Sequence, residues 1–338
     1  MWNPFNTAVL IPIEQAWKQM LRVLFEPFHI QKWFIIGFSC FLAKLVEYLS
    51  NVHSAISSVI PENETSTFSS LSHSAEGFVG LFSISSLLGQ SGDQNFLNWL
   101  ESLSHSMGSF NVDALIVVLV LGILAAITLF LLAITWLDCR GVFMFIDNIA
   151  LDRGDIIESW KKYASQAWQL FWFYLILLIA VIAVIVVGGY TIKTLGVTFD
   201  RENPITLLLL GLAFLGFSLL TALLLFLFKA SVIPRMFAGP YGLLPALLDS
   251  LQLLAKYPLE WILFTMVHFA LWLASYFIII FCCITSCCMA YLPYIHFVVF
   301  LPLYLFLMSY NLTFIRQFGT GWDVFAAGNT DEASSHDS

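Results

Sequence analysis

The chain has 338 residues, of which 59% are hydrophobic and only 11% are charged, and its formal net charge is −8. A soluble domain carries roughly a quarter charged residues, so this composition excludes an ordinary soluble protein. Several apolar runs reach the ~20 residues that a helix needs to cross a bilayer. Spanning segments of this kind must be helical. The sequence therefore predicts an all-α integral membrane protein. It has no basic patch for nucleic acid, and charged residues interrupt its first thirty positions, so no signal peptide is predicted.

Three stretches have the spacing of helices with one apolar face: residues 12–28, 155–167 and 245–256. In the second stretch, Asp155 followed by Glu158 is typical of a helix start. Trp160 and Trp168 lie on its apolar side, which suits the headgroup boundary of a bilayer. We expect all three stretches to be amphipathic interfacial helices. The alternative is that they pack on a protein core, as helices of soluble proteins do.

Six apolar runs are predicted to span the membrane. They cover residues 32–49, 113–137, 168–191, 205–228, 259–281 and 290–314. The predicted architecture is therefore six transmembrane helices in three hairpins, each preceded by one amphipathic helix, within a single domain of residues 1–318. Lys44 and Glu47 interrupt the first run, but they lie three positions apart on one helix face and can pair. Pro302 predicts a kink in the last run.

Two acidic segments and a cysteine cluster lie outside these runs. Residues 50–112 contain no Lys or Arg and are predicted to form an extracytoplasmic loop, partly disordered. Residues 319–338 are predicted to be a disordered acidic cytoplasmic tail. Residues 282–288 read CCITSCC, which matches no zinc spacing. Metal binding and disulfides remain alternatives there, but small side chains at a helix end are favoured.

The distribution of Lys and Arg predicts the orientation. With the N-terminus in the cytoplasm, the outer segments hold only Lys193 and Arg201. The inner segments then hold Lys18, Arg22, Lys32, Arg140, Arg153, Lys161, Lys162, Lys229, Arg235, Lys256 and Arg316. This bias of eleven to two places both termini in the cytoplasm.

Two motifs carry a resemblance. The run LFEPFHIQKWFIIGFSCFLAKL, with Asn3-Pro4-Phe5 before it, and the run RGVFMFIDN at residues 140–148 resemble a family of uncharacterised bacterial six-helix inner-membrane proteins. The repeat of surface helix and hairpin is more loosely similar to the membrane domain attached to some glycerophosphodiester phosphodiesterases. No phosphodiesterase domain is present, so that activity is not implied. The resemblance implies a fold and the bacterial inner membrane as location.

Candidate functional residues fall into two sets. Asp138, Arg140, Asp147, Asp152 and Arg153 are expected to form a polar cluster at the inner end of the second span. This cluster either anchors the helix ends through loop salt bridges, which is favoured, or binds a lipid headgroup or anion with Arg140 as the donor.

The second set lies within the spans and comprises Lys44, Glu47, His268 and His296. Ionisable groups at membrane depth are often functional, but neutral histidines also form hydrogen bonds between helices. We expect the two histidines to be structural, with a proton path as the alternative.

No motif of a soluble enzyme is present, and no catalytic residue, metal site or cofactor is predicted. The sequence favours a non-enzymatic protein that organises the membrane or acts as a partner subunit. The expected partners are the lipid bilayer and another membrane protein or complex. The alternative is a small transporter or lipid-handling protein that uses polar residues between its spans; an intramembrane enzyme is the least favoured reading.

Overall fold

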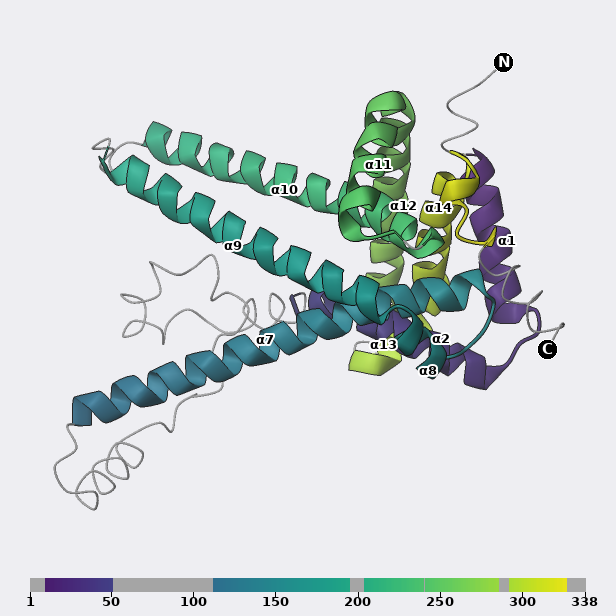
Figure 1. Cartoon of the computed structure of the whole chain (residues 1–338), viewed down its shortest axis with the longest axis horizontal. Helices are drawn as coiled ribbons and strands as arrows, with labels where there is room; N and C mark the ends of the chain where they lie inside the picture. Colours follow the sequence, from purple (N-terminus) through teal and green to yellow (C-terminus); the bar gives the residue numbers. More distant parts are fainter. Residues whose placement is uncertain (1–9, 51–111, 195–203, 240, 286–291, 327–338) are drawn as a thin grey trace. The chain divides into compact units, whose positions relative to one another are not determined.

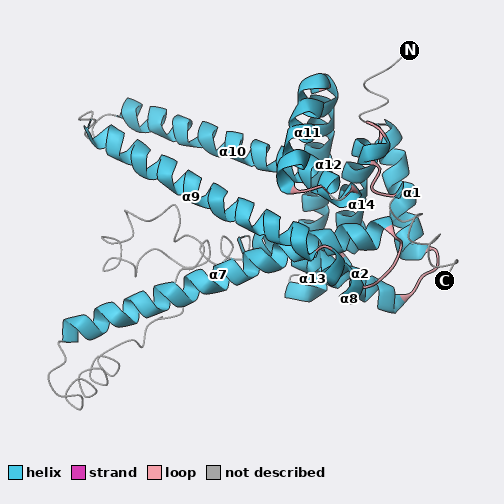
Figure 2. Cartoon of the chain, in the orientation of Figure 1, coloured by secondary structure: helices cyan, strands magenta, loops and turns pink. Residues whose placement is uncertain are grey.

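The computed structural model describes residues 10–50, 112–194, 204–239, 241–285 and 292–326, and the regular structure in these ranges is helical (Figures 1 and 2). The chain divides into two compact units, Lys44–Asp138 and the remainder. The helices are α1 (Ile11–Phe25), α2 (Ile30–Ala43), α7 (Val112–Ala150), α8 (Ile157–Lys162), α9 (Ala164–Thr194), α10 (Pro204–Ala238), α11 (Leu243–Lys256), α12 (Pro258–Thr285), α13 (Pro293–Val299) and α14 (Leu301–Arg316), followed by the 3₁₀ turn η5 (Thr320–Trp322).

Four of these helices are long and apolar enough to cross a membrane, judged by length and composition. The segments are Val118–Ala150, Ala164–Gly188, Gly211–Ala238 and Pro258–Cys282. They correspond to the second, third, fourth and fifth predicted spans. The second span extends further than predicted, because α7 runs to Ala150 and includes the whole RGVFMFIDN motif.

The first and sixth predicted spans differ from expectation. Residues 32–49 do not form one helix, because α2 ends at Ala43 and a turn at Lys44 separates it from a helical segment at 45–50. The sixth run is divided at Phe300 into α13 and α14. Pro302 explains this break, since proline lacks the N–H that would continue the hydrogen-bonding pattern of α13.

The three predicted amphipathic stretches are all helical, with shifted ends. Residues 12–28 correspond to α1 and residues 245–256 to α11. Residues 155–167 contain the short helix α8, a break at Tyr163, and the first turn of α9. Asp155 lies outside α8, yet its carboxylate accepts hydrogen bonds from the amides of Ile157 and Glu158, at 2.9 and 3.2 Å. Asp155 thus caps the start of the helix as predicted, and the helix begins two positions after it, at Ile157.

The core of the larger unit surrounds α14. Its C-terminal half is buried on every side, from Ser309 to Ile315. Helix α1 lies alongside it (Figure 1), and α2, α10, α12 and α13 also contact it. The stacked rings of Phe264 and Phe314, with centroids 4.1 Å apart, join α12 to α14. Within the described residues, the central helix is therefore the last α-helix, α14, and it packs along the first one, α1.

The first residues of the predicted disordered tail are folded. After α14, the turn η5 packs against α10, and Val324 is fully buried. Residues 327–338, most of the loop 50–112, and Cys287 and Cys288 lie outside the described residues.

Candidate functional site

The polar cluster predicted from the sequence is centred on Asp147, near the end of α7. Its side chain is fully buried. One carboxylate oxygen accepts a hydrogen bond from the hydroxyl of Ser159 at 2.5 Å and one from the guanidinium of Arg153 at 3.1 Å. The other oxygen accepts from the hydroxyl of Tyr163 at 3.1 Å. A buried carboxylate needs such donors, because burial without them is costly.

The ring of Tyr163 fixes this arrangement from the apolar side. It stacks between Phe143 of α7 and Phe237 of α10, with centroids 6.0 and 4.8 Å away. Its hydroxyl is therefore held in place towards Asp147. Helical spacing alone gives no sign of this polar contact.

Asn148, the next residue, extends the network to α2 and to the turn before α8. Its amide nitrogen donates to the hydroxyl of Ser39 at 3.3 Å. Its amide oxygen accepts from the backbone N–H of Asp155 at 3.0 Å. Asp147 and Asn148 together hold α2 against the end of α7 and the turn that leads into α8, which lie more than a hundred positions further along the chain.

Arg153 bridges two carboxylates, those of Asp147 and of Glu158, the latter at 3.0 Å. Burial alone would lower the pKa of the Arg153 guanidinium, but these two carboxylates raise it above its ordinary value. The guanidinium of Arg153 is protonated at every physiological pH, as in any arginine, and its positive charge lies against the buried carboxylate of Asp147.

Asp152 belongs to a separate ionic group at the same turn. Lys32 of α2 donates to its carboxylate at 2.8 Å, and the Nε of Arg22 in α1 lies 3.9 Å away. The backbone of Asp152 has a φ of 52°, a left-handed conformation that aspartate tolerates better than most residues. This turn brings the loop back against α1 and α2.

Arg140 contacts Trp160 of α8. Its guanidinium lies over the ring of Trp160, 5.1 Å from the centroid, and donates to the Trp160 carbonyl at 2.5 Å. Asp138 is buried, with 5% of its surface exposed. Four of the five predicted residues therefore take part in three groups of contacts. Arg153 joins Asp147, Asp152 joins Lys32, and Arg140 joins Trp160.

A second polar site, which the sequence analysis did not single out, surrounds Arg235 near the end of α10. Its guanidinium donates twice to one carboxylate oxygen of Asp249 in α11, at 2.7 and 3.0 Å, and also to the carbonyl of Gly321. The rings of Tyr241 and Trp322 lie over it, with centroids 4.1 and 4.8 Å away. The sequence features that could have indicated this site are the acidic residue Asp249 in α11 and the aromatic residues that follow α10 and α14, Tyr241 and Trp322.

The predicted intramembrane polar residues have contacts of their own. Lys44 pairs with Glu47 at 2.7 Å, as their spacing predicted, and both side chains are exposed. His296 is buried, and its Nε2 lies 2.9 Å from the hydroxyl of Tyr304. The ring of His268 packs against the rings of Phe226, Phe264 and Tyr310.

The geometry indicates what these groups do together. Every carboxylate of the Asp147 and Asp152 groups faces a cation or a hydroxyl donor, and each contact joins two different segments. Among the residues that the structure describes, no cluster of three or more His, Cys, Asp or Glu side chains is arranged to hold a metal ion. Comparison with known proteins gives one match, to a family of unknown function that covers residues 9–327. This chain belongs to the DUF7544 family.

The DUF7544 match includes every described helix and both polar sites. Neither the curated proteins nor the solved structures contain a significant match to the chain. Family membership and the four long apolar helices together indicate that this DUF7544 protein is a membrane protein of unassigned activity.

Proposed function

We propose that the protein is a non-enzymatic multi-pass membrane protein that organises the membrane or serves as a partner subunit of another membrane complex. The observation that supports this proposal is the exposure of its long apolar helices. In α9, the consecutive residues Val184, Ile185, Val186 and Val187 are each more than half exposed, at 56, 53, 63 and 60%. Successive residues of an α-helix point about 100° apart, so four in a row sample the whole circumference.

Helix α10 repeats this pattern. Phe214, Leu215, Leu219 and Leu220 are all more than half exposed. The stacked rings of Phe173 in α9 and Phe228 in α10, with centroids 4.3 Å apart, join the two helices. A self-contained bundle would bury one face of each helix. Helices exposed on all faces need lipid or another protein around them, and a partner subunit would supply such a cover.

The proposed topology has six spans and both termini in the cytoplasm, in a bacterial inner membrane. It requires the broken helices α2 and α13–α14 to complete the first and sixth crossings. A contact between an arginine and an aromatic ring occurs three times and supports the arrangement of three hairpins. Arg140, Arg235 and Arg316 lie towards the C-terminal ends of α7, α10 and α14, each over an aromatic ring further along the chain. Those rings are Trp160, Tyr241 with Trp322, and Phe325.

The orientation is tested with a reporter enzyme that is active only outside the cytoplasm. The reporter is fused at Gly92 and, in a second version, after Ser338. We expect activity from the Gly92 fusion alone. Activity from the Ser338 fusion, or none from the Gly92 fusion, contradicts the topology.

The partner role is tested by extracting the protein from its native membrane in polymer-bounded lipid discs and measuring the mass of the assembly. We expect a particle of fixed stoichiometry that contains more protein than one 38.1 kDa chain. Substituting Leu220→Trp or Val186→Trp changes exposed side chains and should reduce the assembly without unfolding the chain. Leu248→Trp, on the exposed side of the non-spanning helix α11, is the matched control. A single chain with lipid, in the wild type and all variants, contradicts the partner role.

A further inference from the structure

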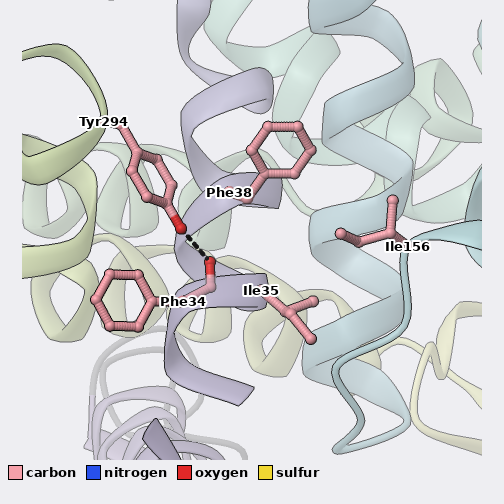
Figure 3. A pocket seen from close by; sticks show the side chains of 5 residues that line it. All are labelled: Phe34, Ile35, Phe38, Ile156 and Tyr294. Carbon is pink, nitrogen blue, oxygen red and sulfur yellow. Dashed lines mark hydrogen bonds between the residues drawn. The ribbon is translucent and has the colours of Figure 1, made fainter. Parts of the chain in front are cut away.

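An apolar slot lies beside the polar cluster. Phe34, Ile35 and Phe38 of α2 line it, with Ile156 from the turn before α8 and Tyr294 from α13 (Figure 3). Its volume is about 270 Å³. Its one polar side-chain group, the Tyr294 hydroxyl, donates to the carbonyl of Phe34 at 2.8 Å, as the dashed line in Figure 3 shows. Because that hydroxyl is hydrogen-bonded to the backbone, the side chains that line the slot present an apolar surface.

The polar cluster fixes the shape of this slot. Ile156 follows Asp155, whose backbone N–H is held by Asn148. Gly154 lies against Lys32 and Ile35, and a Cβ atom added there would be 3.4 Å from the Cα of Lys32. The turn therefore lies directly on α2. The slot is a built feature, because the buried network sets the position of one wall against the other.

Two cations, Lys32 and Arg22, lie on the side of the slot nearest this turn, which also holds the acidic residues Asp155 and Glu158. Lys32 lies one helical turn before Ile35, and Asp152 is shared between Lys32 and Arg22. Two cations thus face one carboxylate. The side chain of Lys32 is 15% exposed, whereas that of Arg22 is 66% exposed and 3.9 Å from Asp152. Arg22 is the group with room to meet an external anion, while Arg153 is occupied by Asp147 and Glu158.

We propose that this slot binds one acyl chain of a membrane phospholipid, with the phosphate of that lipid near Arg22. The size of the slot favours an acyl chain over a protein segment. The slot is open to the surface, and its apolar space of about 270 Å³ admits a length of flexible hydrocarbon. A helix with side chains is roughly 10–12 Å wide and does not fit. A second copy of the chain would need about 800 Å² of buried surface on each partner, far more than five lining residues provide.

The charge beside the slot and the surroundings both match a phospholipid. Its phosphate can pair with the exposed guanidinium of Arg22. Phe34 is 45% exposed at the edge of the slot, and Phe25, Phe28 and Ile30, which precede it along the chain, are exposed as well. Aromatic and aliphatic side chains beside cations are the composition that suits a headgroup boundary. This inference rests on the membrane location and not on the partner role, so a protein without partners would leave it standing.

The test uses the purified full-length protein in mild detergent with a phosphatidylcholine analogue that carries a diazirine at the end of one acyl chain. After illumination, the labelled peptides are identified by mass spectrometry. We expect the label on the segments that contain Phe34 to Phe38 and Tyr294. Ile35→Trp fills the slot and should lower this label roughly tenfold, since several methylene contacts are lost. Ile176→Trp, at an exposed position of α9, is the matched control and should leave the label unchanged.

Two further variants keep the proposal falsifiable. Ile156→Trp fills the slot from the opposite wall and should act as Ile35→Trp does, with circular dichroism and elution volume checking the fold. Arg22→Gln should lower labelling by the phospholipid analogue but not by a diacylglycerol analogue that lacks the phosphate. A label that is spread evenly over α9, α10 and α12, and that does not respond to either tryptophan variant, overturns the proposal. Protein that elutes as a dimer and takes up no label in the slot would assign the surface to a second copy and overturn the proposal as well.

Discussion

The indole Nε1 of Trp33 donates a hydrogen bond to the main-chain carbonyl of Val298, 2.9 Å away. Four residues after Val298 stands Pro302, which has no N–H to offer that carbonyl. The tryptophan of α2 therefore supplies the donor that the helix itself lacks. Gly37 allows the close approach, because a Cβ atom there would lie 2.9 Å from a methyl group of Val298. The break between α13 and α14 is thus stabilised by a residue more than two hundred positions earlier in the chain.

This relationship predicts the effect of Trp33→Phe. Phenylalanine keeps most of the ring packing and removes the donor, so the Val298 carbonyl is left without its bond. We expect a loss of about 1–3 kcal/mol in the free energy of unfolding. Denaturation in detergent, followed by circular dichroism, measures it. Trp172→Phe, at an exposed ring of α9, is the control, and an equal effect of both variants would contradict the role of the hydrogen bond.

Asp147 gives the second prediction. Asp147→Asn removes the charge that balances Arg153 and replaces an acceptor oxygen by a donor facing buried groups. Removing one member of a buried ion pair costs about 3–5 kcal/mol, and Arg153 is partly exposed, so we expect the lower end of that range. Glu158→Gln changes the exposed partner of the same arginine and should cost at most ~1 kcal/mol. Similar unfolding midpoints for the two variants would show that the burial of Asp147 is unimportant.

Gly141 gives the third prediction. In the structure, a Cβ atom at Gly141 would lie 2.4 Å from the backbone nitrogen of Ala43 and 2.5 Å from the backbone carbon of Leu42. Backbone atoms cannot move aside as a flexible side chain can, so Gly141→Ala should force α2 and α7 apart. We expect a destabilisation of about 1–3 kcal/mol. Gly216→Ala in α10, where no atom lies within 4 Å, is the control and should be neutral or slightly stabilising.

Sequence reasoning succeeded where the pattern was local. The four long spans follow from apolar runs such as residues 168–191, and hydrophobicity alone predicts them. The Lys44–Glu47 pair and the role of Asp155 at the start of α8 also depend on neighbours within one helical turn. The broken first run could not be predicted in the same way, because a run of suitable length does not reveal where α2 will turn.

Which residues make up each polar site could not be predicted without the three-dimensional structure. Asp147 and Asp152 lie five positions apart, and the sequence placed them in one cluster, but Lys32 of α2 draws Asp152 into a separate group. Helical spacing does not reveal that Tyr163 and Ser159 both direct their hydroxyls to Asp147. Arg235 was counted only as an orienting charge. Its partners Asp249 and Gly321 lie 14 and 86 positions away, and the longer of these separations leaves no local signal.

The enclosure of Arg235 gives the fourth prediction. Arg235→Lys keeps the charge but loses the planar group that stacks between two rings and bonds to Asp249 and to the Gly321 carbonyl together. We expect a loss of roughly 1.5–3 kcal/mol in unfolding free energy, with η5 released from α10. Faster proteolysis after residue 318 would report this release. Arg316→Lys, whose arginine is half exposed and paired with Asp323, is the control and should change little.

The histidines give the last prediction, which separates the partner role from transport. His296 is buried beside the Tyr304 hydroxyl, and His268 lies among aromatic rings. Both settings suit neutral side chains that hold helices together. Glutamine at position 296 can still bond to a hydroxyl, so we expect the double variant His268→Gln, His296→Gln to stay folded and to form the same assembly as the wild type. Protein in vesicles with an internal pH dye should show no proton flux above empty vesicles, with or without the substitutions. A pH-dependent flux that the wild type supports and the folded double variant loses would favour a transporter, because only a proton path requires groups that titrate near neutral pH.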